Sequence, residues 1–450
     1  MWQALGGSAE VIDQVHCRDA GELPSVYPVT DFATAAVGVA AAAVVELLGA
    51  RFGDLPRASV SRRSASLWYG WSIRPQGWTM PSGWDPLAGD YATADGWIRL
   101  HTNAPHHRDA ALGVLGVAAD RELVAAAVAA WNSETLESAV VERGGCAAAM
   151  HSASAWKAHA QGRSVASEPL LDVQATDGAA DAAVGDVHWA PRRDRPLSGL
   201  RVLDLTRVLA GPVATRFLAG FGADVLRIDP PEWDEPIVVS DVTLGKRCAR
   251  LDLRDPAALA RLRGLLRSAD VLVHGYRADA LDRLGLGVAA RRQIRPGLID
   301  VCLDAYGWSG PWRNRRGFDS LVQMSTGIAE SGMRLLGKAR PTPLPVQALD
   351  HATGYLMAAA VIRGLTGRLR SGRGFEARAS LARTADVLLT APIQWRPGTL
   401  GSMQSDDWSC ELEPTPSGPA YRLRSAVEVA QAPMRWDRPA SQLGSATPEW

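Results

Sequence analysis

A segment that could bind a phosphorylated ligand lies at residues 202–229, which read VLDLTRVLAGPVATRFLAGFGADVLRID. The pattern predicts a strand over Val202–Thr206, a tight turn at Ala210-Gly211-Pro212, a helix over Val213–Gly220 and a second strand over Ala223–Asp229. This order forms a parallel βαβ unit, whose first turn leads into a helix N-terminus where phosphates bind. The turn lacks G-x-G-x-x-G, so it does not predict a dinucleotide site.

Asp350 stands where a carboxylate could do chemistry, because it comes directly before an apolar stretch with helical spacing. A carboxylate can act as a nucleophile in group transfer. An aspartate before a helix more often accepts hydrogen bonds from the first-turn N–H groups as an N-cap. The residue types alone favour the N-cap.

Five segments, in order, resemble the class III CoA-transferases. They are residues 202–229, Gly245–Arg247 with Leu251–Arg254, Ala269–Leu286, Pro296–Asp319 and Leu349–Gly374. Their order and spacing match the family over Pro196–Ser380. The resemblance implies an α/β fold, with a Rossmann-like parallel βαβ large domain plus a smaller α+β domain, interlocked as in that family.

By this resemblance Asp350 occupies the nucleophile position. It would attack an acyl-CoA thioester to give a mixed anhydride, and the released CoA thiolate would form an aspartyl-CoA thioester, from which CoA passes to an incoming carboxylate. Backbone N–H groups near the helix start would stabilise the oxyanions. Asp319, in the triplet Gly317-Phe318-Asp319, would orient the site or tune the charge of Asp350. A loop-capping role is its alternative.

The resemblance also assigns residues to coenzyme A, which would be bound as a substrate. They are Val208, Leu209, Ala210, Leu251, Arg254, Gly275, Tyr276 and Arg283. The two arginines would bind phosphates, unless they lie on a solvated helix face, and the tyrosine would stack or line the pocket. Gly275 stands where the family often has Asn, and Leu209 where some transferases have Gln. No Gly-rich active-site loop is evident, and Arg143–Cys146 is the nearest candidate.

Other functions stay open. α-Methylacyl-CoA racemases share this fold and use the His of a G-H-D triplet, but Phe318 cannot move a proton. His351 follows Asp350 directly, and neighbouring side chains generally diverge, so it is a poor substitute. A non-catalytic CoA-binding subunit and a lyase or dehydratase acting on a CoA ester are further alternatives.

The segments do not follow the family's usual order. Tyr91–Asn103 resembles the start of the small domain, with Ala119–Met150 as its continuation, yet both precede the βαβ segment. Val29–Leu48 resembles Ala348–Leu365 at an offset of 319 residues, which places Asp31 on Asp350 and predicts an internal duplication. Asp31 would lie in a relic half-site or help shape the remaining site. A match of two Ala-rich helices by composition is the alternative.

We therefore predict six segments: a degenerate copy of the Asp-bearing helix (1–75), a small α+β domain (76–165), a linker (166–196), a CoA-binding domain (197–345), the catalytic helix (346–395) and a tail that packs back (396–450). The linker is rich in Ala, Asp, Gly and Pro, which suits a surface connection. Class III enzymes are interlocked dimers, so the resemblance implies a monomeric fused pseudo-dimer with one site, or a homodimer. Its partners would be an acyl-CoA and a carboxylic acid.

Composition excludes several classes. The 48 basic and 48 acidic residues balance, which disfavours nucleic acid and membrane surfaces as partners. The five cysteines form no C-x-x-C pair, which predicts reduced thiols, a cytoplasmic protein and no metal site. His106-His107 is expected in a solvated loop. The N-terminus shows no secretion signal, and Ala33–Val45 is too short to span a bilayer and is expected to be a buried helix.

Overall fold

A seven-stranded sheet forms the centre of the computed structural model, which describes residues 1–175 and 189–450. The strand order is β10-β9-β8-β11-β12-β13-β7, and every pair is parallel except β13–β7. The strands are β7 (Asp172–Ala175), β8 (Arg201–Leu205), β9 (Asp224–Asp229), β10 (Lys246–Arg250), β11 (Val271–His274), β12 (Ile299–Asp304) and β13 (Phe375–Ser380). The predicted α/β class is confirmed.

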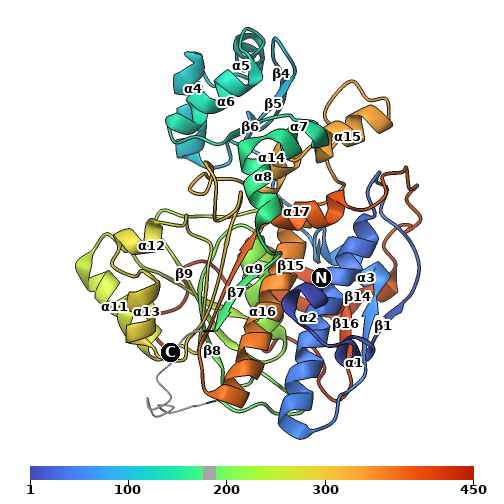
Figure 1. Ribbon diagram of the computed structural model, residues 1–450, viewed down its shortest axis with the longest axis vertical. Coiled ribbons are helices and arrows are strands. Elements are labelled where there is room, and N and C mark those ends of the chain that lie inside the picture. The colour runs from blue at the N-terminus through green and yellow to red at the C-terminus, as the bar shows by residue number, and fades with distance from the viewer. Residues whose placement is uncertain (176–188) are drawn as a thin grey trace.

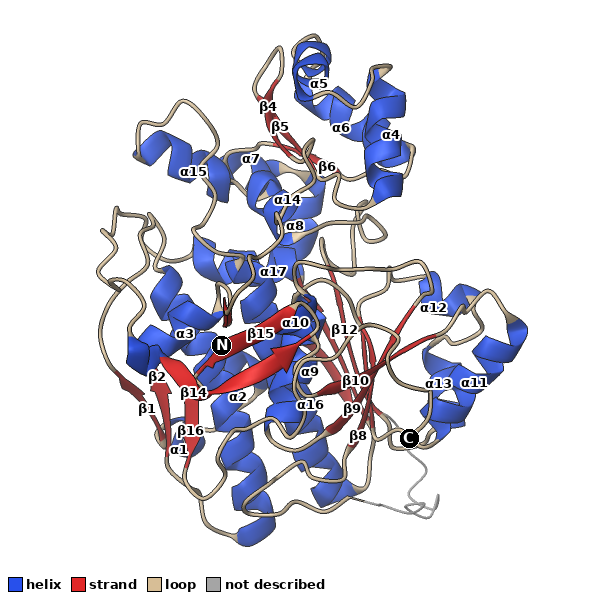
Figure 2. Cartoon of the chain, turned by 180° about the vertical axis from the view of Figure 1, so that it is seen from behind, coloured by secondary structure: helices blue, strands red, loops and turns tan. Residues whose placement is uncertain are grey.

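Helices cover both faces of this sheet (Figures 1 and 2). Val202 of β8 faces one core, shared with α9 and α16, whereas Leu203 and Leu205 face a second core beneath α11. The helices of this region are α9 (Ala210–Gly220), α10 (Val239–Val242), α11 (Pro256–Arg267), α12 (Ala280–Arg283), α13 (Val288–Ile294), α14 (Asp319–Ser325), α15 (Ile328–Leu335), α16 (Ala348–Ser371) and α17 (Leu381–Leu389).

The predicted βαβ unit is present, with one correction. Ala210-Gly211-Pro212 is not a turn but the first turn of α9. Proline fits there because its missing N–H would have no partner in the first helical turn. The chain instead reverses at residues 206–209, immediately after β8.

The small domain lies at one end of the molecule, at the top of Figure 1, and has its own core around Tyr91, Ile98 and Leu136. Its sheet order is β4-β5-β6. The elements are β4 (Gly89–Ala92), β5 (Trp97–Leu100), α4 (Pro105–Leu115), α5 (Arg121–Val128), α6 (Ser133–Glu142) and β6 (Ala147–Ala149), followed by α7 (Ala153–Ala158) and α8 (Ala160–Ser167).

The predicted linker lies only partly within the described residues, because 176–188 fall outside them. Of the remainder, β7 pairs with β13, and Trp189 and Arg195 are buried. The described parts of this connection are therefore built into the large domain.

The two ends of the chain come together in two small sheets, β1-β2-β16 and β14-β15-β3. The elements are η1 (Gln3–Leu5), α1 (Ala9–Ile12), β1 (Val15–Arg18), α2 (Val29–Phe52), β2 (Ala58–Ser61), α3 (Arg62–Trp68), β3 (Ile73–Pro75), η2 (Ser405–Asp407), β14 (Trp408–Thr415), β15 (Gly418–Leu423) and β16 (Val427–Val429). The predicted tail thus supplies strands to sheets that it shares with the N-terminal segment.

The N-terminal segment repeats the backbone of the α16 region. Both α2 and α16 have 24 residues, their N-caps have nearly the same dihedrals (φ −77°, ψ 65° and φ −78°, ψ 66°), and both end at a left-handed glycine, Gly53 and Gly372. Each leads to a strand and then to a helix capped by a serine, Ser61 or Ser380. Each strand also has one parallel and one antiparallel neighbour. The two segments therefore share helix length, N-cap dihedrals and the order of helix, strand and helix.

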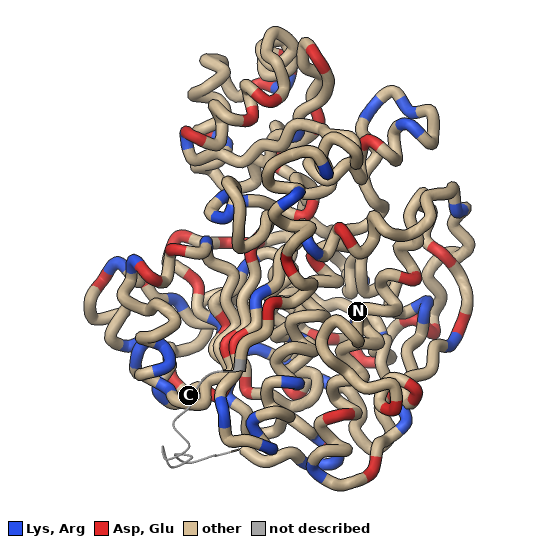
Figure 3. The backbone as a smooth tube through the Cα atoms, viewed as in Figure 1, with Lys and Arg blue, Asp and Glu red and all other residues tan. Residues whose placement is uncertain are grey.

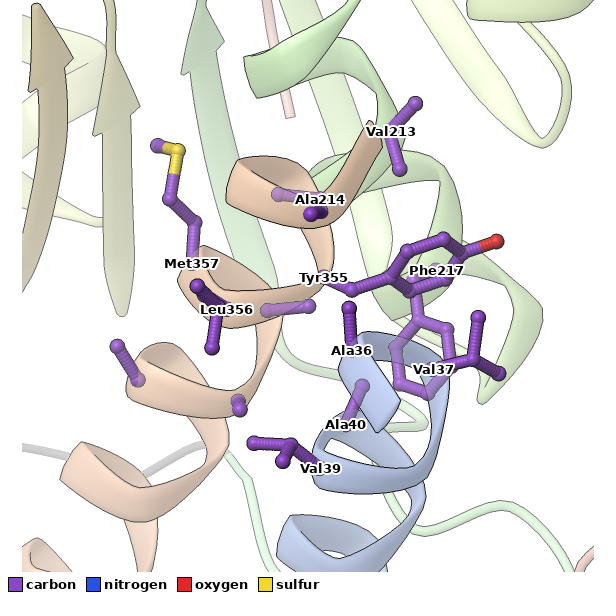
Figure 4. Close-up of a cluster of buried hydrophobic side chains, with 14 of the residues drawn as sticks. Ala36, Val37, Val39, Ala40, Val213, Ala214, Phe217, Tyr355, Leu356 and Met357 are labelled. Atoms are coloured by element: carbon purple, nitrogen blue, oxygen red, sulfur yellow. The ribbon is translucent and has the colours of Figure 1, made fainter. Parts of the chain in front are cut away.

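Helix α2 packs against α16 and contributes to the same core as α9. Figure 4 shows Ala36, Val37 and Ala40 of α2 close to Phe217 of α9 and Tyr355 of α16. Among the described helices, α2 is the one long and apolar enough to cross a membrane by length and composition alone, with 89% of its most apolar window buried inside the protein. The predicted buried helix over Ala33–Val45 is confirmed.

Candidate active site

The strand order reverses between β8 and β11, since β9 and β10 lie on one side of that pair and β12 and β13 on the other. Open parallel sheets bind ligands at the carboxyl ends of the strands at such a point. Five of the predicted CoA-binding residues follow these two strands. They are Val208, Leu209 and Ala210 after β8, and Gly275 and Tyr276 after β11.

Buried carboxylates hold the loop after β8 in an unusual shape. Val208 has φ +66°, a conformation that β-branched residues rarely adopt, and its N–H donates to the Glu235 carboxylate at 2.6 Å. The Asp204 carboxylate accepts from the N–H and the hydroxyl of Thr206. A Cβ on Gly211 would lie 2.3 Å from the Thr206 side chain, so the close approach requires glycine. The result is a helix N-terminus presented at the sheet edge, where an anion can bind.

Arg207, which the sequence analysis did not single out, stands beside this loop. Its guanidinium carbon lies 4.9 Å from the ring centroid of Trp233 and 5.3 Å from that of Tyr276, and it donates to the Tyr276 hydroxyl at 3.3 Å. No carboxylate pairs with it among the described residues. Its place in the loop after the first strand of the βαβ motif could have identified it from the sequence. Since it has no carboxylate partner in the described structure, its guanidinium is suited to bind a phosphate.

The two predicted phosphate-binding arginines are engaged locally. Arg254 is 73% exposed and pairs with Asp252 at 2.7 Å, while Arg283 is 66% exposed and pairs with Asp279, the N-cap of α12. Leu251 packs beside the second core. At Gly275 a Cβ would lie 3.2 Å from a Leu303 methyl, so an Asn side chain there requires that neighbour to move.

Asp319 and Asp350 form a buried carboxyl pair at the start of α16. The Asp319 Oδ2 atom accepts from the N–H groups of Leu349 at 2.9 Å and Asp350 at 3.1 Å, and its other oxygen accepts from Gln323. Asp350 is 5% exposed and lies inside the first turn, with Gln347 at the N-cap. The N-cap interpretation of Asp350 is therefore wrong, because Asp319 caps this helix from another element.

Burial changes the protonation of both carboxyls. It raises the pKa of Asp319 to about 6, against the hydrogen bonds from Gln323 and the backbone, which lower it. Burial, and next the negative charge of Asp319, raise the pKa of Asp350 well above its usual range. No hydrogen bond to the Asp350 carboxyl is made by any described side chain or backbone N–H. The carboxyl of Asp350 is thus free for a ligand, and it must lose a proton before it can act as a nucleophile.

The small domain docks onto the element that carries Asp319. Arg315 pairs with Glu137 at 2.8 Å and donates to the Ala147 carbonyl at 2.9 Å. The ring of Phe318 stacks on His101 with centroids 3.7 Å apart and planes 1° from parallel. Two domains that are distant in sequence therefore border the carboxyl pair.

The Gly-rich candidate loop lies at this same interface. The Gly144 carbonyl accepts from Arg316 at 3.1 Å, and the buried Cys146 thiol lies 3.5 Å from the Nε2 atom of His107. The expectation for His106-His107 is wrong, because both lie on α4 and His107 is buried, although His106 is exposed.

Two other predicted candidates lie elsewhere. His351 is buried and stacks on Tyr69 with centroids 4.9 Å apart, and burial lowers its pKa to about 3. The Asp31 side chain is 55% exposed and pairs with Arg62 at 2.6 Å. Within 1–175 and 189–450, no group of three or more His, Cys, Asp or Glu is placed to hold a metal.

Comparisons with known proteins give matches over part of this chain. Residues 197–416 match CoA-transferase family III. A succinate–glutarate CoA-transferase of Agrobacterium fabrum is 34% identical over 41% of this chain and 50% of its own length. An acyl-CoA transferase of Gibberella moniliformis is 29% identical over 65% of this chain and 54% of its own length. The chain spans about half the length of these curated relatives.

A solved structure of Rv3272 from Mycobacterium tuberculosis is similar as well. It is 31% identical, and the superposition covers 45% of this chain and 58% of that one with a TM-score of 0.40.

Proposed function

We propose that this protein moves CoA from an acyl-CoA donor to a carboxylic acid acceptor, with Asp350 as the nucleophile. The observation that supports this best is a buried aspartate that makes no side-chain hydrogen bond within the described structure and sits in a first helical turn held by a second carboxylate. The match of residues 197–416 to CoA-transferase family III and the named transferases among the relatives support the same reaction class.

The Asp350 carboxylate attacks the thioester carbonyl, the C–S bond breaks, and CoA leaves as a thiolate while the acyl group and Asp350 remain joined as a mixed anhydride. The thiolate attacks the Asp350 carbonyl of that anhydride, which releases the donor acid and leaves an aspartyl-CoA thioester. The acceptor carboxylate then attacks this thioester, and the CoA thiolate attacks the acceptor carbonyl of the new anhydride. The product acyl-CoA forms, and the Asp350 carboxylate is regenerated.

The same geometry suggests where CoA binds. The N-terminus of α9 and the guanidinium of Arg207 are suited to phosphate oxygens, and Tyr276 offers a ring beside them. Racemisation through a G-H-D triplet finds no support, because Phe318 has no acid–base group and its ring is stacked on His101.

The experiment is intact-protein mass spectrometry after mixing with a panel of acyl-CoAs, followed by peptide mapping. A CoA-sized adduct on the Asp350 peptide, absent from Asp350→Asn, is expected. CoA binding without any adduct would favour a non-catalytic CoA-binding subunit. Racemisation without an adduct would favour a racemase, and elimination without an adduct would favour a lyase or dehydratase.

We also propose that one chain contains both halves of an interlocked pair, with one working site. The matching bounds of α2 and α16 support this, as does the docking of the small domain that follows α2 onto the large domain that carries α16. One adduct per chain in a monomeric protein is expected from combined mass and light-scattering measurements. Two adducts per chain would refute the proposal.

A cytoplasmic location is proposed as well. Its support is that all five cysteines are free thiols, two of them, Cys17 and Cys410, exposed.

A further inference from the structure

The loop after β9, residues 230–238, contacts two consecutive residues of the loop after β8. The Glu235 carboxylate accepts from the N–H of Val208 at 2.6 Å. The ring of Trp233 lies beside the guanidinium of Arg207, with 4.9 Å between the guanidinium carbon and the ring centroid. One loop therefore contacts both the backbone and the side chains that lead into the N-terminus of α9.

A buried arginine fixes the Glu235 carboxylate. Arg227 is fully buried, and its guanidinium donates to one oxygen of Glu235 at 2.5 Å and to both oxygens of Asp229 at 2.9 Å. The side chain of Glu235 is 5% exposed, so few water molecules can replace these bonds. Hydrogen bonds between charged groups are short and directional. One carboxylate oxygen thus binds the scaffold, and the other is presented to Val208.

The backbone of the loop is anchored as well. Arg250 donates to the carbonyl oxygens of Pro230 at 3.1 Å and Trp233 at 2.9 Å, and to the carboxylate of Asp234 at 2.6 Å. The Glu235 carbonyl accepts from the N–H of Val239, the first residue of α10, at 2.9 Å. Glu235 is therefore carried by a segment that is held at several points.

Val208 needs such support because of its own backbone conformation. Of the three described non-glycine residues with positive φ, it is the β-branched one, and its φ of +66° is strained for that side chain. A strained conformation of this kind persists only where its surroundings enforce it. The next residue, Leu209, is the N-cap of α9, and its side chain cannot cap the helix. The conformation of Val208 therefore sets the direction of first-turn N–H groups that are open to a ligand.

We propose that Glu235 is a positioning residue, which keeps the N-terminus of α9 in its anion-binding arrangement by holding Val208 in the left-handed conformation. Glu235 acts through Val208 and does not touch the ligand. Without it, Val208 can return to negative φ, and only a fraction of the molecules presents the helix start to a phosphate. The apparent dissociation constant then rises by the inverse of that fraction. The inference rests on the proposed CoA transfer, because the phosphate is that of CoA.

The test measures the dissociation constant of CoA by calorimetry in two backgrounds. Glu235→Ala should raise it about tenfold, because the strain of Val208 is no longer offset. In the Val208→Gly background the same substitution should raise it about threefold or less, because glycine adopts positive φ without steric cost. A loss of stability alone would give the same factor in both backgrounds. During turnover, KM for the acyl-CoA should rise with Glu235→Ala while kcat stays within about twofold.

Glu232→Ala is the matched control, because this carboxylate lies on the same loop with its side chain 62% exposed and should change nothing. Hydrogen exchange of a peptide covering residues 206–212, measured without ligand, should become faster with Glu235→Ala only. An unchanged CoA affinity, an equal factor in both backgrounds or unchanged exchange would overturn the inference. If the wild-type protein binds no CoA, the proposed transfer fails, whereas the exchange rates still support or overturn the role of Glu235.

Discussion

Helices α2 and α16 present the same backbone with an aspartate at the same place, yet the two aspartates are in different environments. Asp350 is 5% exposed beside a second carboxyl, whereas the Asp31 side chain is 55% exposed and neutralised by Arg62. The cause is what covers each helix start. Over α16 lie α14 and the loop after β8, while α2 connects the parallel strands β1 and β2 of a three-stranded sheet and its Asp31 stays exposed. A carboxylate in a first helical turn therefore gains or loses reactivity from its neighbours alone.

Replacing each aspartate in turn should give the largest difference in activity between the two helix starts. Asp350→Ala should lower transfer by about 10³-fold or more while CoA still binds, because the covalent intermediate cannot form. Asp31→Ala should leave turnover within about twofold. Steady-state kinetics with CoA titration distinguishes the two, and an equal loss in both variants would mean that both carboxylates work.

A pair of glycine substitutions tests the packing of the two helices. A Cβ on Gly354 would lie 2.4 Å from the Ala210 carbonyl oxygen, whereas one on Gly38 meets its nearest atom at 3.9 Å. Gly354→Ala should lower the free energy of unfolding by about 1–3 kcal/mol, because α16 must move away from α9. Gly38→Ala should raise it by about 0.5–1 kcal/mol through helix propensity. Denaturant titration measures both, and a stabilised Gly354→Ala would contradict the close α9–α16 contact.

The pH dependence of transfer tests whether the charge of Asp319 acts on Asp350. Burial and the Asp319 charge raise the pKa of Asp350, and the nucleophile must be ionised, so activity should rise with pH along an acid limb that lies above the usual range of an aspartate. Asp319→Asn removes that charge, lowers the pKa of Asp350 and should move the acid limb of the kcat/KM profile to lower pH. Asp31→Asn is the control, for which the same limb should stay in place. If the acid limb of Asp319→Asn stays in place, the charge of Asp319 does not affect the ionisation of Asp350.

The smallest effect is expected at the ion pair that neutralises Asp31. Arg62→Met removes a pair that is 24% and 55% exposed on its two sides, and such pairs contribute about 0–1 kcal/mol. The melting temperature should change by a few degrees at most, and turnover should not change. A CoA adduct appearing on the Asp31 peptide in this variant would show that only the ion pair keeps the second carboxylate inactive.

Much of the large domain was predictable, because alternating apolar strands and helices specify a parallel sheet locally. Helix α11 has such local signals, because Asp255 caps it by accepting from Ala257 and Ala258 and Pro256 occupies its first position. The error at Ala210–Pro212 has a local cause as well, since Gly-Pro indicates both a turn and a helix start, and only the strained Val208 shows where the chain reverses.

The site was predictable as a set of motifs but not as an arrangement. The sequence by itself determined the α/β class, the strand and helix order of the large domain and the resemblance to the class III transferases, because these follow from local periodicity and from residue types in a fixed order. Tertiary structure alone decided that Asp319 caps α16, that Arg207 stands against Trp233 and Tyr276, and that His101 of the small domain stacks on Phe318. Burial and charge pairing depend on contacts between residues far apart in the chain, so no local pattern could have specified them.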